Sequence, residues 1–187
     1  MRGFAAHSAV GRGAVKTLVL GGVRSGKSRY AGELARAEAC PVTLIVTGAA
    51  GDAEMAARIE AHRASRPSDW TVVEESTRLS AALRAAASPA RVVIVDCLTL
   101  WLSNLLCGEN AEALRQEPLS LLETLPRLEG QVILIGNEVG LGIVPANALA
   151  RRFADEAGAL HQRLAALCDR VVLMVAGLPV FLRAAPP

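Results

Sequence analysis

The sequence feature that most constrains the fold is a glycine-rich motif that follows a short apolar segment. Residues 21–28 match the pattern G-x-x-x-x-G-K-[ST]. Residues 15–20 before the motif have the character of a buried strand, and a helical pattern runs from residue 27 to about residue 38. Such a loop lets backbone N–H groups surround a phosphate chain, and the helix N-terminus adds positive potential. The motif therefore predicts a strand–loop–helix unit that binds nucleotide phosphates.

The motif also predicts roles for individual side chains. Lys27 is expected to reach the β- and γ-phosphates and to be catalytic, and Ser28 is expected to bind Mg²⁺. For Arg24 and Arg29, a solvated surface position is an equally good interpretation. The nucleotide-binding residues predicted from this segment are Gly21, Gly22, Val23, Arg24, Ser25, Gly26, Lys27, Ser28 and Arg29.

An acidic residue ends another apolar segment. Asp96 follows four consecutive apolar residues, 92–95, and a carboxylate at the end of a neighbouring strand can hold the metal or its water shell. The alternative is that Asp96 caps the helix predicted over residues 98–106. Ser28 and Asp96 are thus the candidate Mg²⁺ ligands of a nucleotide site whose phosphate acceptor this pattern does not identify.

The rest of the chain alternates short apolar segments with helical patterns. Apolar strands that are separated by helices indicate a parallel sheet covered on both faces. We expect a disordered leader over residues 1–14 and, over residues 15–187, one α/β domain that is P-loop NTPase-like (RecA-like), with a mostly parallel sheet. Residues 108–118 are expected to form a polar connection. The other predicted strands are 42–47, 71–74, 91–96, 131–135, 170–175 and 180–183, and the other predicted helices are 52–65, 79–87, 98–106 and 147–167.

Composition excludes several classes of protein. The net charge is only +2 and six aromatic residues are present, none interleaved with basic ones, which argues against a nucleic-acid partner. No apolar run approaches the roughly 18 residues that a membrane helix needs. The four cysteines, Cys40, Cys97, Cys107 and Cys168, lack metal-ligand spacing and are expected to be small buried side chains in a reducing compartment. Because residues 1–14 do not resemble a signal peptide, we expect a cytoplasmic location.

His62 is the next informative residue. In the helix predicted over residues 52–65, Glu54, Arg58 and His62 share one drifting face. A histidine in that position can be an ordinary residue of an amphipathic helix. The nearby arginines would repel one another, and an anionic ligand would relieve that repulsion.

Four segments together resemble one family. They are residues 21–28, 52–67, 96–106 and 137–145, and the last carries the pattern N-E-V-G-x-G-I-V-P. With the H-x-x-x-R-P pattern of residues 62–67, they resemble the bifunctional adenosylcobinamide kinase/adenosylcobinamide-phosphate guanylyltransferases of adenosylcobalamin (vitamin B12 coenzyme) biosynthesis. The resemblance covers about residues 15–183.

The resemblance implies two reactions. A nucleoside triphosphate, ATP or GTP, phosphorylates adenosylcobinamide, and GTP then guanylylates His62, which passes GMP to the cobinamide phosphate. A neutral imidazole is a competent nucleophile for such a step, and Lys27 with Mg²⁺ would hold the departing pyrophosphate. The resemblance also implies a homotrimer and further nucleotide contacts from Thr47, Gly48, Ala49, Arg63, Ala64, Ser65, Arg66 and Glu74.

The chain departs from the family pattern at residues 48–51, which match it more loosely than usual, and at two single positions. Ala61 stands where many members have a second histidine, and His161 precedes Gln162 where the family tends to have Asn-Gln. His161 is therefore interpreted as a helix-face residue or a substrate contact. Glu138 is a candidate base or metal-shell residue for the kinase step.

Two other functions stay open from the sequence. The first is a single-activity kinase for another small alcohol, in which His62 is structural. The second is a nucleotide-sensing module that binds a triphosphate without turning over cobinamide. The sequence does not show the choice between ATP and GTP in the kinase step.

Overall fold

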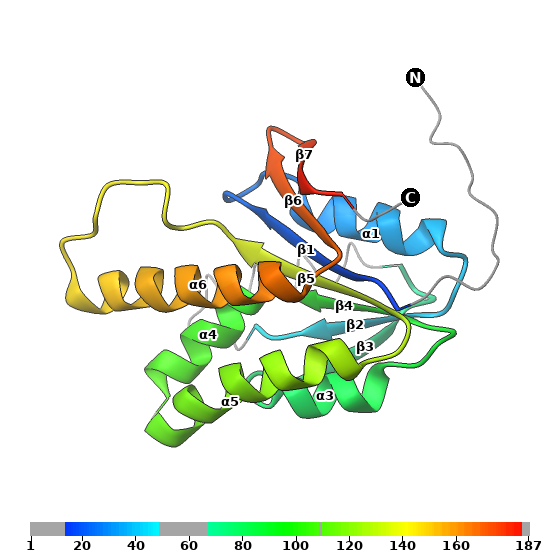
Figure 1. The fold of residues 1–187 in the computed structure, drawn as a ribbon, viewed down its shortest axis with the longest axis horizontal. Coiled ribbons are helices and arrows are strands. Elements are labelled where there is room, and N and C mark those ends of the chain that lie inside the picture. Colours follow the sequence, from blue (N-terminus) through cyan, green and yellow to red (C-terminus); the bar gives the residue numbers. More distant parts are fainter. Residues whose placement is uncertain (1–13, 49–66, 109, 185–187) are drawn as a thin grey trace.

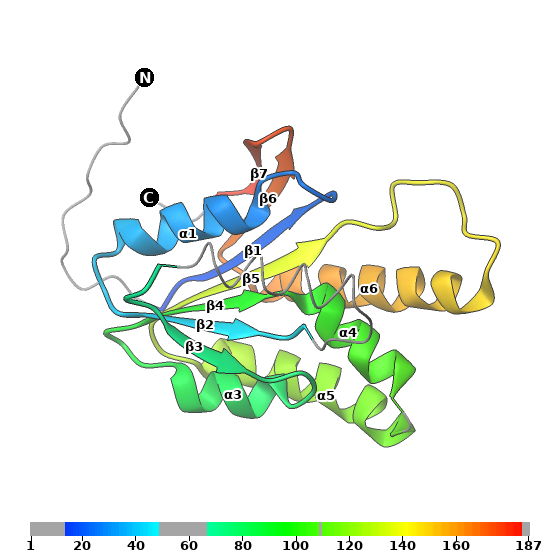
Figure 2. The ribbon, with the colours of Figure 1, turned by 180° about the vertical axis from the view of Figure 1, so that it is seen from behind.

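The computed structural model describes residues 14–48, 67–108 and 110–184. The predicted helix 52–65, and the leader predicted over residues 1–14 except for residue 14, lie outside these ranges. The described residues form a seven-stranded sheet in the order β3-β2-β4-β5-β1-β6-β7 (Figures 1 and 2). The strands are β1 Lys16–Gly21, β2 Val42–Val46, β3 Thr71–Glu74, β4 Val92–Asp96, β5 Gln131–Asn137, β6 Arg170–Val175 and β7 Leu178–Arg183.

Helices cover both faces of the sheet, as Figures 1 and 2 show. One face packs against α1, and the other packs against α3, α4, α5 and α6. The paired strands run parallel except for β6 and β7, so the predicted α/β class with a mostly parallel sheet is confirmed. The helices are α1 Lys27–Ala37, α3 Leu79–Ala86, α4 Leu98–Cys107, α5 Ala111–Thr124 and α6 Ala148–Leu167, with a short 3₁₀ helix, η1 Leu125–Arg127.

The central strands are apolar on both sides because both of their faces are buried. In β1, Leu18 and Leu20 point to the face covered by α6, and Val19 points to the face covered by α1. Burying one such side chain contributes roughly 1.5–3 kcal/mol. This explains why these strands read as continuous apolar runs rather than as alternating patterns.

The expectation of a polar connection over residues 108–118 is wrong. Helix α5 begins at Ala111, continues through Pro118 and ends at Thr124. The Asn110 side chain caps it by accepting hydrogen bonds from the backbone N–H groups of the second and third helical residues. Proline normally breaks a helix, so Pro118 argued against a helix in this part of the sequence. Burial of Leu121 and Leu122 in the core stabilises the helix beyond it.

Strand β7 begins at Leu178, two residues before the predicted start at residue 180, and it is antiparallel to β6. The turn between them is made by Ala176 and Gly177, with φ values of 51° and 81°. Two consecutive positive φ angles are typical of the two-residue hairpin turns that match strand twist. Ala176 gave no sequence indication of such a turn, which explains the late predicted start.

No helix in the described part of the chain combines the length and apolar character that a membrane crossing requires.

Candidate functional site

The predicted phosphate-binding loop connects β1 to α1. Gly21 ends β1, and a Cβ atom there would lie 2.6 Å from both the Met174 carbonyl oxygen and Ser25 Oγ. Gly26 caps α1 with a φ of 95°, a conformation that glycine adopts without strain. The Gly177 N–H donates to the Ser25 carbonyl at 3.0 Å, so the β6–β7 turn braces the loop. The local geometry therefore requires glycine at positions 21 and 26.

Lys27 spans this loop. It is the first residue of α1, and its Nζ donates to the Gly22 carbonyl oxygen at 2.7 Å. Burial lowers the pKa of Lys27, and the nearby Cys97 and Asp96 partly oppose that effect. Its ammonium thus lies against the backbone of the loop whose amides are expected to bind phosphate.

Ser28 and Asp96 meet although their elements are not neighbours in the sheet. Strand β5 lies between β1 and β4, but the first turn of α1 brings Ser28 Oγ to donate to Asp96 Oδ2 at 2.8 Å. A hydroxyl and a carboxylate are the hard oxygen ligands that Mg²⁺ prefers, usually together with substrate phosphates. The residue that caps α4 is Cys97, without a side-chain cap bond, so the alternative role of Asp96 as a cap is not observed.

Other predicted nucleotide contacts lie at the same carboxyl edge of the sheet. Thr47 follows β2 and is fully buried, and its Oγ1 donates to the Cys97 carbonyl at 2.6 Å. Gly48 comes next in the chain, and Glu74 ends β3 opposite Val46. Parallel strands bring these residues to the edge that also carries Asp96.

The remaining predicted site residues divide into two groups. Val23 and Arg24 are exposed, Arg24 with a φ of 55°. Arg29 donates to the Gly177 carbonyl at 3.3 Å, so Arg29 contacts the hairpin turn. The others lie outside the described residues: Ala49, His62, Arg63, Ala64, Ser65 and Arg66.

Glu138 lies just beyond the end of β5, beside the phosphate loop. Its N–H donates to the Gly21 carbonyl at 3.0 Å, and its Oε1 accepts from the Gly140 N–H at 2.6 Å. His161 on α6 lies beneath this point, only 8% exposed, with its Nε2 2.8 Å from where a Cβ on Gly136 would be. Burial lowers the pKa of His161, and the charge of Glu138 partly opposes the shift. Its burial supports the helix-face interpretation over a substrate contact.

The four cysteines only partly match the expectation of buried side chains. Cys97 and Cys168 are buried, Cys40 is half-buried and Cys107 is exposed, and all four are free thiols. Burial raises the pKa of Cys168 to about 12, so this thiol is inert as a nucleophile. The described residues contain no group of three or more His, Cys, Asp and Glu side chains placed to hold a metal ion.

Sequence reasoning gave no role to the polar side chains of α4, although they lie at the strand ends. Thr99 Oγ1 accepts from the Asn137 N–H at 2.7 Å. Asn104 Nδ2 donates to the Thr47 carbonyl at 2.7 Å and to the Ser76 carbonyl at 3.0 Å. The polar residues Thr99, Ser103 and Asn104 within a mainly apolar helix were the available indication.

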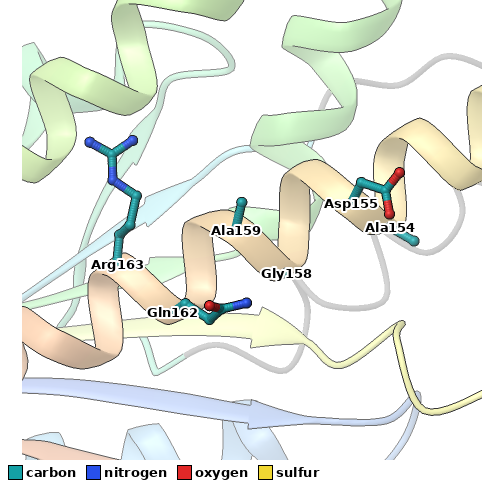
Figure 3. A pocket seen from close by; sticks show the side chains of 6 residues that line it. All are labelled: Ala154, Asp155, Gly158, Ala159, Gln162 and Arg163. Carbon is teal, nitrogen blue, oxygen red and sulfur yellow. The ribbon is translucent and has the colours of Figure 1, made fainter.

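A shallow hollow along α6 contributes nothing to this site. Figure 3 shows its lining, which contains none of the predicted site residues: Ala154, Asp155, Gly158, Ala159, Gln162 and Arg163.

Comparison with known proteins identifies close relatives. A family model, CobU, described as cobinamide kinase / cobinamide phosphate guanyltransferase, matches residues 17–182. The chain is 50% identical over 172 residues to the bifunctional adenosylcobalamin biosynthesis protein CobP of Pseudomonas aeruginosa, covering 92% of this chain and 99% of the relative. It is 40% identical over 176 residues to the bifunctional adenosylcobalamin biosynthesis protein CobU of Escherichia coli, covering 87% and 97%.

Solved structures with low sequence identity share the fold. A protein of Pyrococcus horikoshii OT3 matches with a TM-score of 0.54 at 8% identity, covering 92% of this chain and 87% of that one. The flagellar accessory protein FlaH of Methanocaldococcus jannaschii matches with a TM-score of 0.50 at 13% identity, covering 91% and 78%.

Proposed function

The chain belongs to the cobinamide kinase / cobinamide phosphate guanyltransferase family, and we propose which of its residues carry out the family's two reactions. It is a bifunctional transferase of adenosylcobalamin biosynthesis. It phosphorylates adenosylcobinamide with a nucleoside triphosphate and transfers GMP to the product, giving adenosylcobinamide-GDP. The contact between Ser28 and Asp96, beside Lys27, is the observation that best supports our residue assignment.

In our proposal one loop holds the triphosphate of ATP or GTP in both reactions. The backbone N–H groups of residues 21–26 surround the phosphates, and Lys27 leaves the Gly22 carbonyl to contact the β- and γ-phosphates. Ser28 Oγ and Asp96 would hold Mg²⁺, which when bound neutralises charge on these phosphates. Both oxygens already lie within 2.8 Å of each other, which supports their sharing one cation.

In the kinase step, the hydroxyl oxygen of adenosylcobinamide attacks the γ-phosphorus. The bond from that phosphorus to the β–γ bridging oxygen breaks, and the nucleoside diphosphate leaves with the electron pair. Lys27 and the loop amides stabilise the developing charge. We assign the role of accepting the hydroxyl proton to Glu138. This residue directly follows β5, the strand between β1 and β4, and lies beside Gly21 of the phosphate loop.

In the guanylyl step, the imidazole of His62 attacks the α-phosphorus of GTP and pyrophosphate leaves. A phosphate oxygen of the cobinamide phosphate then attacks the same phosphorus, the P–N bond breaks and His62 is regenerated. Arg63 and Arg66, with the neighbouring Ala64 and Ser65, contact the nucleotide. These assignments rest on the sequence resemblance, because the residues lie outside the described ranges.

The strand ends complete the nucleotide site in this proposal. Thr47, Gly48 and Glu74, with Ala49, contact the nucleoside end of GTP. The place of Thr47, Gly48 and Glu74 at the carboxyl edge, where β2 pairs with the strand that carries Asp96, supports this role, since ligands of parallel α/β sheets bind at that edge.

We also propose a homotrimer that works in the cytoplasm. Apolar side chains are exposed in the loop after β5, where Leu141 is 83% and Ile143 98% exposed, and on β7 at Phe181 and Leu182. Such exposed apolar patches are typical of association surfaces. Free thiols at all four cysteines suit a reducing compartment.

Selectively labelled GTP tests the proposed reactions. Label at the γ-phosphate should appear on adenosylcobinamide, whereas label at the α-phosphate should appear first on the protein and then on cobinamide phosphate. Transfer of γ-label alone, with no α-label on the protein, would indicate a single-activity kinase. Binding of GTP without transfer of either label would indicate a nucleotide sensor.

A further inference from the structure

Asn104 links the segments that follow β2 and β3, where several of the proposed nucleotide contacts lie. It lies in α4, which extends beyond the carboxyl ends of β4 and β2 (Figure 2). Its single amide nitrogen donates to the Thr47 carbonyl at 2.7 Å and to the Ser76 carbonyl at 3.0 Å. Thr47 directly follows β2, and Ser76 lies two residues after β3.

Thr47, one of the two residues that Asn104 contacts, is also hydrogen-bonded to the end of β4. The Thr47 N–H donates to the Asp96 carbonyl at 3.2 Å, and Thr47 Oγ1 accepts from the Cys97 N–H at 3.0 Å. On the other side, the Glu75 N–H donates to the Val46 carbonyl at 3.0 Å. Asn104 therefore adds one side-chain link between two backbone segments that converge at the end of β2.

Helix α4 is a rigid support for this link. Trp101 is fully buried in the core, and its Nε1 donates to the Thr77 carbonyl at 2.7 Å. Leu98, Leu102 and Leu105 are also buried in the same cluster. Because these side chains fix the helix, the amide of Asn104 is presented at a defined position.

We propose that Asn104 is a positioning residue for guanylyl transfer. It sets the relative placement of the strand ends that carry Thr47, Gly48 and Glu74. In the sequence, Thr47 and Gly48 directly precede the segment that contains His62. Asn104 has no hydrogen bond to Lys27, Ser28 or Asp96 in the described structure. Its hydrogen-bonded connection to Asp96 runs through Thr47, whose N–H donates to the backbone carbonyl of Asp96 and not to its carboxylate. We therefore expect γ-phosphoryl transfer to depend on Asn104 less than guanylyl transfer does. The inference rests on the proposed function, in which His62 is the nucleophile.

The test compares the two reactions in Asn104→Leu, which keeps the approximate size of the side chain and removes its N–H donors. At saturating GTP, we expect guanylylation of the protein to slow at least about tenfold, because small misplacements of reacting groups are costly. The kcat of adenosylcobinamide phosphorylation should stay within about threefold of wild type, since at saturating nucleotide the strand ends contact the nucleoside end and not the γ-phosphate that is transferred. Asn104→Gln, which retains the amide on a longer chain, should recover part of the guanylylation rate.

Asn110→Ala is the matched control. Asn110 also makes two side-chain bonds to the backbone, but they cap α5, so its loss should lower stability and leave the ratio of the two reactions unchanged. If Asn104→Leu does not fold, Asn104→Asp, which has nearly the same shape, replaces it. Equal loss of both reactions, or unchanged guanylylation, would overturn the positioning role. If the wild-type protein takes no guanylyl group on His62, the proposed function fails, and this inference fails with it.

Discussion

His161 illustrates how a single buried residue couples the region beside the site to pH. Its imidazole lies against Gly136 under the end of β5, and burial lowers its pKa from the usual value of 6.5. In the unfolded chain the imidazole regains its usual pKa, so the unfolded state binds more protons between the two pKa values. The neutral ring therefore stabilises the fold above about pH 6.5, and this contribution is lost as the pH falls toward the folded-state pKa.

Replacing His161 with Asn, the residue that the family tends to have, should remove this dependence. We expect the free energy of unfolding of the wild type to fall more steeply than that of His161→Asn between about pH 7.5 and 5, by at most about 1.4 kcal/mol per pH unit. Denaturant titrations of both proteins at several pH values measure the difference. His7 and His62 are common to both proteins and cancel. If the free energy of unfolding changes with pH equally in the wild type and in His161→Asn across that range, the account is contradicted.

Candidate site residues that belong to a local sequence pattern could be predicted from the sequence. Residues whose contacts join distant segments of the chain could not. Lys27 and Ser28 follow from the spacing of the loop motif, and Asp96 follows from its place after an apolar run. Asn104 contacts backbone atoms 57 and 28 residues away, so its role depends on how α4 lies over the strand ends. No short-range pattern encodes that arrangement.

Helix α5 shows the same contrast at the scale of an element. Its N-terminal cap, Asn110, is a recognisable start, but Pro118 lacks the N–H that would bond to the Leu114 carbonyl and so argues against a helix. Tertiary packing of Leu121 and Leu122 outweighs this local cost. An apolar contact made by residues after the proline is information that the local pattern does not contain.

Pro118→Ala should therefore stabilise the protein. An interior proline costs a helix about 3 kcal/mol, and the greater freedom of the unfolded alanine chain returns up to about 1 kcal/mol of that gain. We expect a net increase in the free energy of unfolding of about 1–2 kcal/mol, measured by thermal or denaturant unfolding. Leu119→Ala, at the next position, controls for the general effect of alanine in α5. A destabilised Pro118→Ala protein would mean that the proline bends α5 into its packed position.

At the scale of the whole molecule, the described residues of the proposed site lie at one edge of one sheet. The sequence pattern indicated parallel strands covered by helices, but it contained no information on strand order. The structure places β5 between β1 and β4, so Glu138 emerges beside the phosphate loop and close to the strand that carries Asp96. The order also puts the ends of β2 and β3 next to β4, where Thr47 and Glu74 join the same edge.

The central claim is that this edge supports a covalent guanylyl-His62 intermediate. The most direct measurement is the intact mass of the protein after incubation with GTP and Mg²⁺, made in parallel on wild type, His62→Ala and Lys27→Ala. The account predicts a GMP-sized increase in wild type that is stable to base and labile to acid, as a P–N bond should be. It predicts none in His62→Ala and little in Lys27→Ala. A wild-type protein that binds GTP but gains no mass, or a His62→Ala protein that still gains it, would contradict the account.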